Sequence, residues 1–262
     1  MDLASFGIEK IEVFVLVLAR TAGIFTIVPI FGANQVPVQV RIAIALAITF
    51  VLVPLCMPAG VGLLATDVLP MVLLVAKEVL VGLVIGFVTT LVFAAMQLAG
   101  DFVDVQSGFS FAMMLDPVYG AQTAVAGRIQ YLLAGMLFFA TNAHLILVSG
   151  LADSWRLVPI GQFSLHPAVA GGVIDLFASL FAVALRIAAP VVAAVFLADV
   201  AMAIVARAVP QMNILLAGFP LKLGVGLVGM LIALPVAAAL SRGALAGIHP
   251  ETVGLLRLLT GR

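Results

Sequence analysis

Long stretches without a charged residue are the feature that most limits what this chain can fold into. The two clearest run from Val79 to Gly100 and from Ile129 to Ala152. About 20 consecutive apolar residues are enough to cross a bilayer as an α-helix. Only 9% of the 262 residues are charged, whereas about 25% is usual in a soluble domain. The sequence therefore predicts an all-α protein of the integral-membrane type.

The hydropathy pattern predicts about six hydrophobic helical segments, several of them broken. We expect the first segment to fail near Pro29, because proline lacks a backbone N–H and clashes with the preceding turn. The second segment is expected to be helical up to the pair Pro54 and Pro58, and Pro235 is expected to interrupt the last segment. The N-terminus lacks the basic stretch of a signal peptide, so we expect the first segment to stay in the mature protein. The six segments begin near Ile11, Ile42, Val79, Ile129, Val173 and Leu223.

Charge and cysteine content exclude several classes of function. The chain has 12 Lys and Arg against 12 Asp and Glu, so it lacks the basic surface that a nucleic-acid partner requires. A single cysteine, Cys56, and the lack of clustered histidines give no redox or metal-binding framework. We therefore expect no nucleic-acid partner and no cofactor.

One cluster suggests a hydrolase, formed by His144, Ser149 and Asp153. On a helix, however, His144 and Ser149 would lie about 140° apart. No G-x-S-x-G turn presents Ser149 as a nucleophile. We therefore expect that the protein is not an enzyme.

Charged residues inside the apolar stretches are the main candidates for a functional role, because each costs roughly 2.5 to 3.5 kcal/mol at membrane depth. Adjacent residues Lys77 and Glu78 point about 100° apart on a helix and cannot pair with each other. Asp199 and Arg207 are separated by about 12 Å of helical rise. Each is expected to find a partner on another helix or chain; a proton relay is the sharper alternative. The residues assigned to buried charge and assembly are Lys77, Glu78, Arg186, Asp199, Arg207 and Lys222.

The interruption from Asp101 to Arg128 is rich in phenylalanine and methionine. Methionine is flexible and adapts to irregular gaps, so such a segment has an apolar surface that can change its shape. Placed across a channel, it would form a hydrophobic constriction that excludes water. A loop buried between helices fits the same composition, and composition alone leaves both interpretations open.

Several motifs, in order along nearly the whole chain, resemble the FliR/SctT family of type III export proteins. No one motif is decisive, but their order, the chain length and the hydropathy together are specific. The motifs include Val36–Arg41 (VPVQVR), Gln106–Phe111 (QSGFSF), Leu157–Gly161 (LVPIG), Ala208–Asn213 (AVPQMN) and Gly218–Lys222 (GFPLK).

The resemblance implies a component of the export gate in the bacterial inner membrane, at the flagellar basal body. It implies assembly with FliP-like, FliQ-like and FlhB-like subunits into a channel for unfolded flagellar export substrates; the motifs favour the flagellar over the virulence system. The fold it implies is a FliP-like part over residues 1–182 joined near Val183 to a FliQ-like hairpin with a C-terminal tail, residues 183–262. It also makes residues 108–123 a pore plug, with the contacts Gly108, Phe109, Phe111, Met113, Met114, Asp116 and Pro117.

Hydropathy alone also permits a self-contained secondary transporter or channel. That alternative requires a solute site near the midplane of a closed helical bundle. The sequence shows no clear inverted repeat, and its charges are scattered along the chain.

Overall fold

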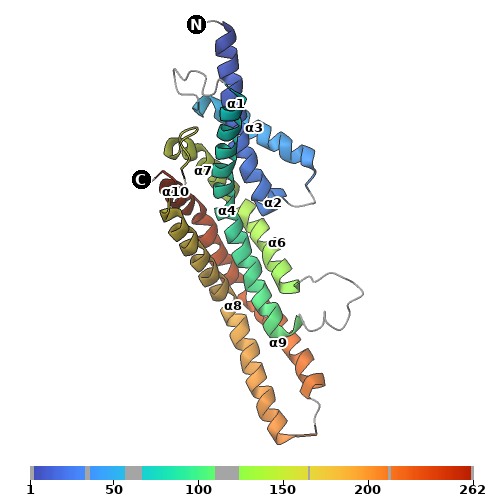
Figure 1. Ribbon diagram of the computed structural model, residues 1–262. Coiled ribbons are helices and arrows are strands. Elements are labelled where there is room, and N and C mark those ends of the chain that lie inside the picture. Colours follow the sequence, from blue (N-terminus) through green and yellow to red (C-terminus); the bar gives the residue numbers. More distant parts are fainter. Residues whose placement is uncertain are drawn as a thin grey trace. The chain divides into compact units, whose positions relative to one another are not determined.

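A computed structural model describes residues 3–32, 36–56, 67–109, 124–164, 166–211 and 214–260. Over these residues the regular secondary structure is entirely helical (Figure 1), which confirms the all-α prediction. The helices are α1 (Leu3–Ile27), α2 (Pro29–Gly32), α3 (Val38–Cys56), α4 (Val68–Ser107), α6 (Val125–Ala140), α7 (Ala143–Leu157), α8 (Ala168–Ala208), α9 (Ile214–Ala246) and α10 (Ile248–Leu258).

All six predicted segments are helical, but several boundaries differ from the prediction. Helix α4 has 40 residues and begins ten positions before Glu78, so the charges at 77 and 78 lie inside it rather than ahead of it. The segment predicted from Ile129 to Ala152 is two helices, because Asn142 adopts a left-handed backbone conformation with φ 57°. Helix α9 continues through Pro235, so the interruption predicted there is wrong.

Within the part of the chain that the structure describes, four helical stretches are long and apolar enough to cross a membrane, as expected of a membrane protein. The pair α6 and α7, broken at Asn142, makes a fifth if it counts as one span. The four stretches are Val38–Leu55, Val68–Ser107, Ala168–Ala208 and Gly218–Leu258.

The chain forms two compact units, each assembled from separated parts of the sequence. Unit 1 comprises Met1–Leu91, Asn142–Leu176 and Ala246–Arg262, and unit 2 comprises Val92–Thr141 and Phe177–Leu245. The join near Val183 lies within the continuous helix α8 and stays a prediction.

Unit 1 is held by close helix packing. Helix α3 lies against α1, and α10 lies against α7. Helix α4 meets α1 through glycines: a Cβ atom on Gly23 would come within 2.7 Å of the Val79 carbonyl oxygen, and one on Gly82 would collide with the Arg20 carbonyl. Glycine is required here because the backbones approach so closely.

Unit 2 contains the last four turns of α4, with α6, α9 and most of α8. Gly100 of α4 faces the backbone of Gly127 in α6, and Gly226 of α9 faces the Ser107 side chain. The side of α8 that faces inward carries the buried residues Leu180, Ala184, Ile187, Ala188, Val191 and Val195.

Candidate functional site

A fully buried ion pair lies at the contact between α1 and α4 in unit 1. The Arg20 guanidinium is 2.6 Å (Nη2) and 2.7 Å (Nε) from the Glu78 carboxylate, with side chains 0% and 1% exposed. Arg20 also donates hydrogen bonds to the Ser154 Oγ at 2.9 Å and to the Val158 carbonyl at 3.0 Å, and its guanidinium stacks 4.9 Å from the Trp155 ring centre. Glu78 therefore has the partner on another helix that its position requires.

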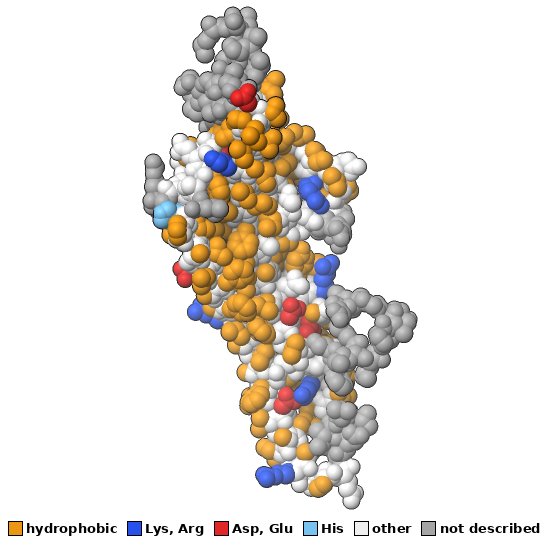
Figure 2. All heavy atoms as spheres, in the orientation of Figure 1, with side chains coloured by type: hydrophobic (Ala, Val, Ile, Leu, Met, Phe, Trp, Pro, Cys, Tyr) orange, Lys and Arg blue, Asp and Glu red, His pale blue; other side chains and the backbone are white. Residues whose placement is uncertain are grey.

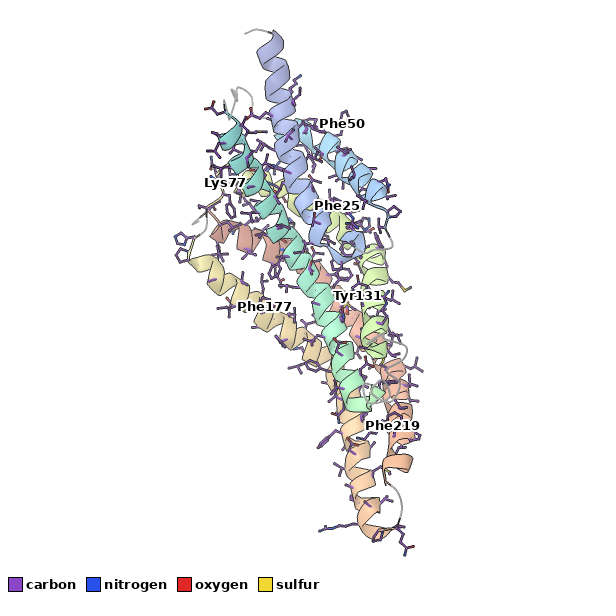
Figure 3. The ribbon with its side chains drawn as sticks, turned by 45° about the vertical axis from the view of Figure 1, so that its right-hand side comes forward. Phe25, Phe50, Lys77, Tyr131, Phe177 and Phe219 are labelled. Atoms are coloured by element: carbon purple, nitrogen blue, oxygen red, sulfur yellow. The ribbon has the colours of Figure 1, made fainter. Side chains whose placement is uncertain are left out.

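The same site fixes the turn that follows α7. The second Glu78 oxygen accepts a hydrogen bond from the Gly161 N–H at 3.0 Å. The Lys77 ammonium, labelled in Figure 3, donates to the Gly161 carbonyl at 3.3 Å. Gly161 has φ +77°, a conformation that favours glycine. Lys77 and Glu78 cannot pair with each other, but both form hydrogen bonds with the backbone of Gly161.

Sequence reasoning missed Arg20 as the partner of Glu78. The available signal was a lone arginine inside the first apolar segment, because a charge at such a position almost always has a partner in the protein interior. The two residues are 58 positions apart, so helical spacing could not have paired them.

A second ion pair joins three helices of unit 2. The Lys222 ammonium on α9 is 2.6 Å from the Asp199 carboxylate on α8, and the side chains are 33% and 30% exposed. The Gln106 amide on α4 donates to the other Asp199 oxygen at 3.3 Å. As predicted from the sequence, Asp199 has a partner on another helix, and this helix belongs to the same chain. Its role in assembly stays a prediction.

Asp104 caps a neighbouring helix. Its two carboxylate oxygens accept hydrogen bonds from the backbone N–H groups of Ala126 and Gly127, both at 3.0 Å, in the first turn of α6. The N-cap residue, Ala124, has no side-chain acceptor of its own. The first N–H groups of a helix lack intrahelical partners and carry positive partial charge. A buried carboxylate from α4 therefore supplies the side-chain hydrogen-bond acceptor that the N-cap residue lacks.

The expected plug segment begins where α4 ends. Gly108 has φ +81°, and a Cβ atom there would lie 3.4 Å from the ring of Phe219 on α9 (Figure 3). Phe109 is half-buried. The remaining plug residues lie outside the described residues, and they are Phe111, Met113, Met114, Asp116 and Pro117.

Two of the charges assigned to the interior are not buried within the single chain. Arg186 and Arg207 are both exposed on α8. Both interrupt an apolar segment of the sequence, which is why burial was predicted for them. Their burial against partner chains stays a prediction.

Two members of the predicted hydrolase cluster form contacts outside it. The Ser149 hydroxyl donates to the Ile146 carbonyl of its own helix, at 2.8 Å. Asp153 pairs instead with the imidazole Nε2 of His249 on α10, at 3.1 Å. No group of three potential metal ligands occurs among the residues that the structure describes.

Large apolar side chains are exposed along α3, α8 and α9. Figure 2 shows apolar side chains over much of the visible face, with few charges among them. Monomeric soluble proteins rarely expose so much contiguous apolar surface, which marks contact with lipid or other protein chains. Examples with at least half of the residue exposed are Phe50, Val51, Leu55, Phe181, Leu185, Phe196, Leu197, Ile204, Val228, Leu231, Ile232 and Val236.

Comparison with known proteins covers nearly the whole chain. A family model described as "Bacterial export proteins, family 1" matches residues 11–247. The flagellar biosynthetic protein FliR of Bacillus subtilis (strain 168) is 33% identical over 258 residues, which is 97% of this chain and 98% of that protein. FliR of Escherichia coli (strain K12) is 31% identical over 84% of each chain. The Yop proteins translocation protein T of Yersinia pestis is 31% identical over 80% of each chain.

Proposed function

Because the chain belongs to family 1 of the bacterial export proteins, we propose that it is a component of the flagellar type III protein export gate. In this proposal it lies in the bacterial inner membrane at the flagellar basal body. It forms the export channel for unfolded flagellar substrates with FliP-like, FliQ-like and FlhB-like subunits. It is a channel component and not an enzyme.

The observation that carries this proposal is the extent of the similarity to FliR. The match to the Bacillus subtilis protein extends over 98% of that protein's length, so it includes more than one shared helical hairpin. The virulence relative from Yersinia pestis matches over 80% of its length. The longer match favours flagellar export over virulence secretion.

The exposed apolar surface supports assembly with other chains. Helices α8 and α9 approach each other closely at Val191 and Gly229, and both expose large apolar side chains elsewhere on their surfaces. The partner subunits would cover that surface. The exposed Arg186 and Arg207 would then acquire their partners from those subunits.

We further propose that residues 108–123 seal the channel at rest. A pore wide enough for an unfolded chain would leak ions unless an apolar element filled it, since a hydrophobic constriction excludes water. Phenylalanine and methionine side chains in this segment supply that property. The constriction interpretation is supported by the family and by the position of the segment directly after α4.

Genetic replacement tests the proposed function. This chain, expressed in a Bacillus subtilis strain that lacks its own FliR, is expected to restore flagellin export and swimming. The readouts are flagellin in the culture medium and spreading in soft agar, with membrane levels of the chain measured in parallel. Because a foreign subunit can fail to fit the host's partners, the chain is also co-expressed with its own FliP-like and FliQ-like partners. Absence of export in both settings, at normal membrane levels, would contradict the proposal.

A further inference from the structure

Helix α8 has two sides that are both largely apolar but differ in burial. The side that carries its buried residues faces the interior of the chain. On the opposite side, exposed residues recur at intervals of three or four, which places them within about 80° of one another on an α-helix. We call these residues the α8 stripe, and they are Ala182, Arg186, Ala189, Ala193, Leu197, Val200, Ile204 and Arg207.

The exposed apolar surface of α8 is longer than a membrane is thick. Large apolar side chains are exposed along this helix from Ile174 to Val205, which corresponds to about 46 Å of helix. The hydrocarbon core of a bilayer is about 30 Å thick. A helix tilted by about 40° would still extend this surface over about 36 Å along the membrane normal. Lipid therefore cannot cover all of it, and another protein chain has to cover the rest.

Arg186 lies inside this apolar surface. Leu185 beside it and Leu197 three turns later are both exposed. Among the residues that the structure describes, the Arg186 guanidinium forms no hydrogen bond or ion pair. Asp199 of the same helix projects about 140° away from Arg186 and pairs with Lys222 instead. A charge inside an apolar stretch almost always has a partner, so the surface around Arg186 is incomplete in the described part of this chain.

We propose that the α8 stripe docks an apolar helix of a neighbouring subunit, and that this helix carries an aspartate or glutamate opposite Arg186. The inference rests on the proposed function, because it assigns one contact within the assembled export gate. A guanidinium group binds a carboxylate through two parallel hydrogen bonds. A single polar contact in an otherwise apolar helix interface fixes the register of the two helices. Arg186 would therefore determine where the partner helix lies along α8.

The composition of the stripe favours a helix of a different subunit over a second copy of this chain. Both charges of the stripe, Arg186 and Arg207, are positive. Two copies that meet through this stripe would bring like charges together without a carboxylate between them. The exposed Ala189 and Ala193, which follow Arg186, allow the backbone of another helix to approach closely. The complementary partner is thus an apolar helix that contributes the negative charge.

The first experiment compares Arg186→Glu, Arg186→Lys and Arg242→Glu in the tagged full-length chain, expressed with its partner subunits. In the contacts described, the exposed Arg242 of α9 bonds only to the Ala238 carbonyl of its own helix, so it is the matched control. The measured quantity is the amount of partner subunits recovered per tagged chain. Arg186→Glu is expected to lower it about tenfold or more, because two carboxylates would then face each other. Arg186→Lys, which keeps the charge but loses the planar fork, is expected to lower it about two- to threefold. Arg242→Glu should leave it unchanged.

The second experiment identifies the docked helix. The photoreactive residue p-benzoylphenylalanine replaces Ala189, which lies one turn after Arg186 on the same side of α8. After irradiation of the assembled complex, the cross-linked peptide is expected to come from an apolar helix of another subunit. That helix should contain an aspartate or glutamate within about one turn of the cross-linked residue. Changing this carboxylate residue to arginine, together with Arg186→Glu, should restore the recovery of the partner subunits.

Several outcomes overturn the proposal. They are equal recovery of partner subunits by Arg186→Glu and Arg242→Glu, a cross-link from position 189 to a second copy of this chain or to lipid only, and a charge exchange that does not restore recovery. A lower thermal stability of the isolated Arg186→Glu chain in detergent would also overturn it, because the role of Arg186 would then lie within its own chain. If the unmodified chain recovers partner subunits and Arg186→Glu recovers them equally, this inference alone fails. If the unmodified chain recovers none, the proposed function fails with it.

Discussion

Replacing Glu78 with alanine is expected to lower the free energy of unfolding by about 3 to 5 kcal/mol, because it leaves the buried Arg20 guanidinium without its anion. Arg20 is 0% exposed and cannot reach water instead. The change also removes the acceptor for the Gly161 N–H, so the turn after α7 loses a contact. The complex should accumulate poorly for the same reason.

Denaturant unfolding of the chain in detergent measures this effect, with the yield of assembled complex as a second readout. Arg156→Ala is the matched control within unit 1, since the Arg156 side chain is 87% exposed and lies 3.9 Å from Asp153. Exposed pairs of this kind contribute at most about 1 kcal/mol. The double variant Arg20→Ala with Glu78→Ala should cost less than the sum of the two single changes. Equal losses for Glu78→Ala and Arg156→Ala would contradict the account of this site.

Changing Phe109, Met113 and Met114 to glycine is expected to raise the resting ion permeability of the complex strongly while leaving its assembly intact. Glycine removes the apolar side chains that would fill the channel and keeps the backbone length. The segment lies between α4 and α6, whose contacts through Asp104 and Gly100 do not involve these side chains. The variant should therefore change the ion permeability of the complex without changing the amount of complex that assembles.

Membrane depolarisation and growth after induction measure the permeability, at equal amounts of assembled complex. Met136→Ala is the control, because it removes an exposed methionine from α6 outside the segment. An unchanged leak with normal assembly would reject the seal. The segment would then be a buried connector, the alternative that its composition also permits.

The helices could be predicted from the sequence because long apolar stretches have few other structures available in a membrane. Their ends were less predictable. The predicted start of α4, near Val79, follows the charged residue Glu78, whereas Glu78 lies inside the helix and pairs with Arg20. Asp199, which interrupts the apolar pattern of α8, likewise lies inside its helix and pairs with Lys222. At these two positions a residue from another helix of the chain compensates the charge.

The helix break at Asn142 shows a second limit of prediction from the sequence. The segment around it is apolar and contains no proline, so its pattern indicates one helix. Asparagine tolerates the left-handed conformation better than most residues, but nothing in the local sequence requires it to adopt that conformation. Tertiary packing decides this position.

The candidate site was partly predictable, because a charged residue inside an apolar segment needs a partner. Composition and motifs pointed to Glu78, Asp199 and Lys222 as residues that need partners, and the structure pairs each of them. Asp104, in contrast, accepts hydrogen bonds from the first turn of another helix. Asp104 caps α6, whose first residue lies 21 positions further along the chain. Only the folded structure could identify this helix as its partner.

The composition of the complex purified through this chain tests the central claim most directly. A tag on the chain, in cells that also express its FliP-like and FliQ-like partners, should recover one large species that contains those subunits. The partners should raise both the yield and the thermal stability of the chain, since they cover its apolar surface. Recovery of a stable monomer, with the same thermal stability in the presence and absence of the partners, would contradict the claim and favour a self-contained transporter.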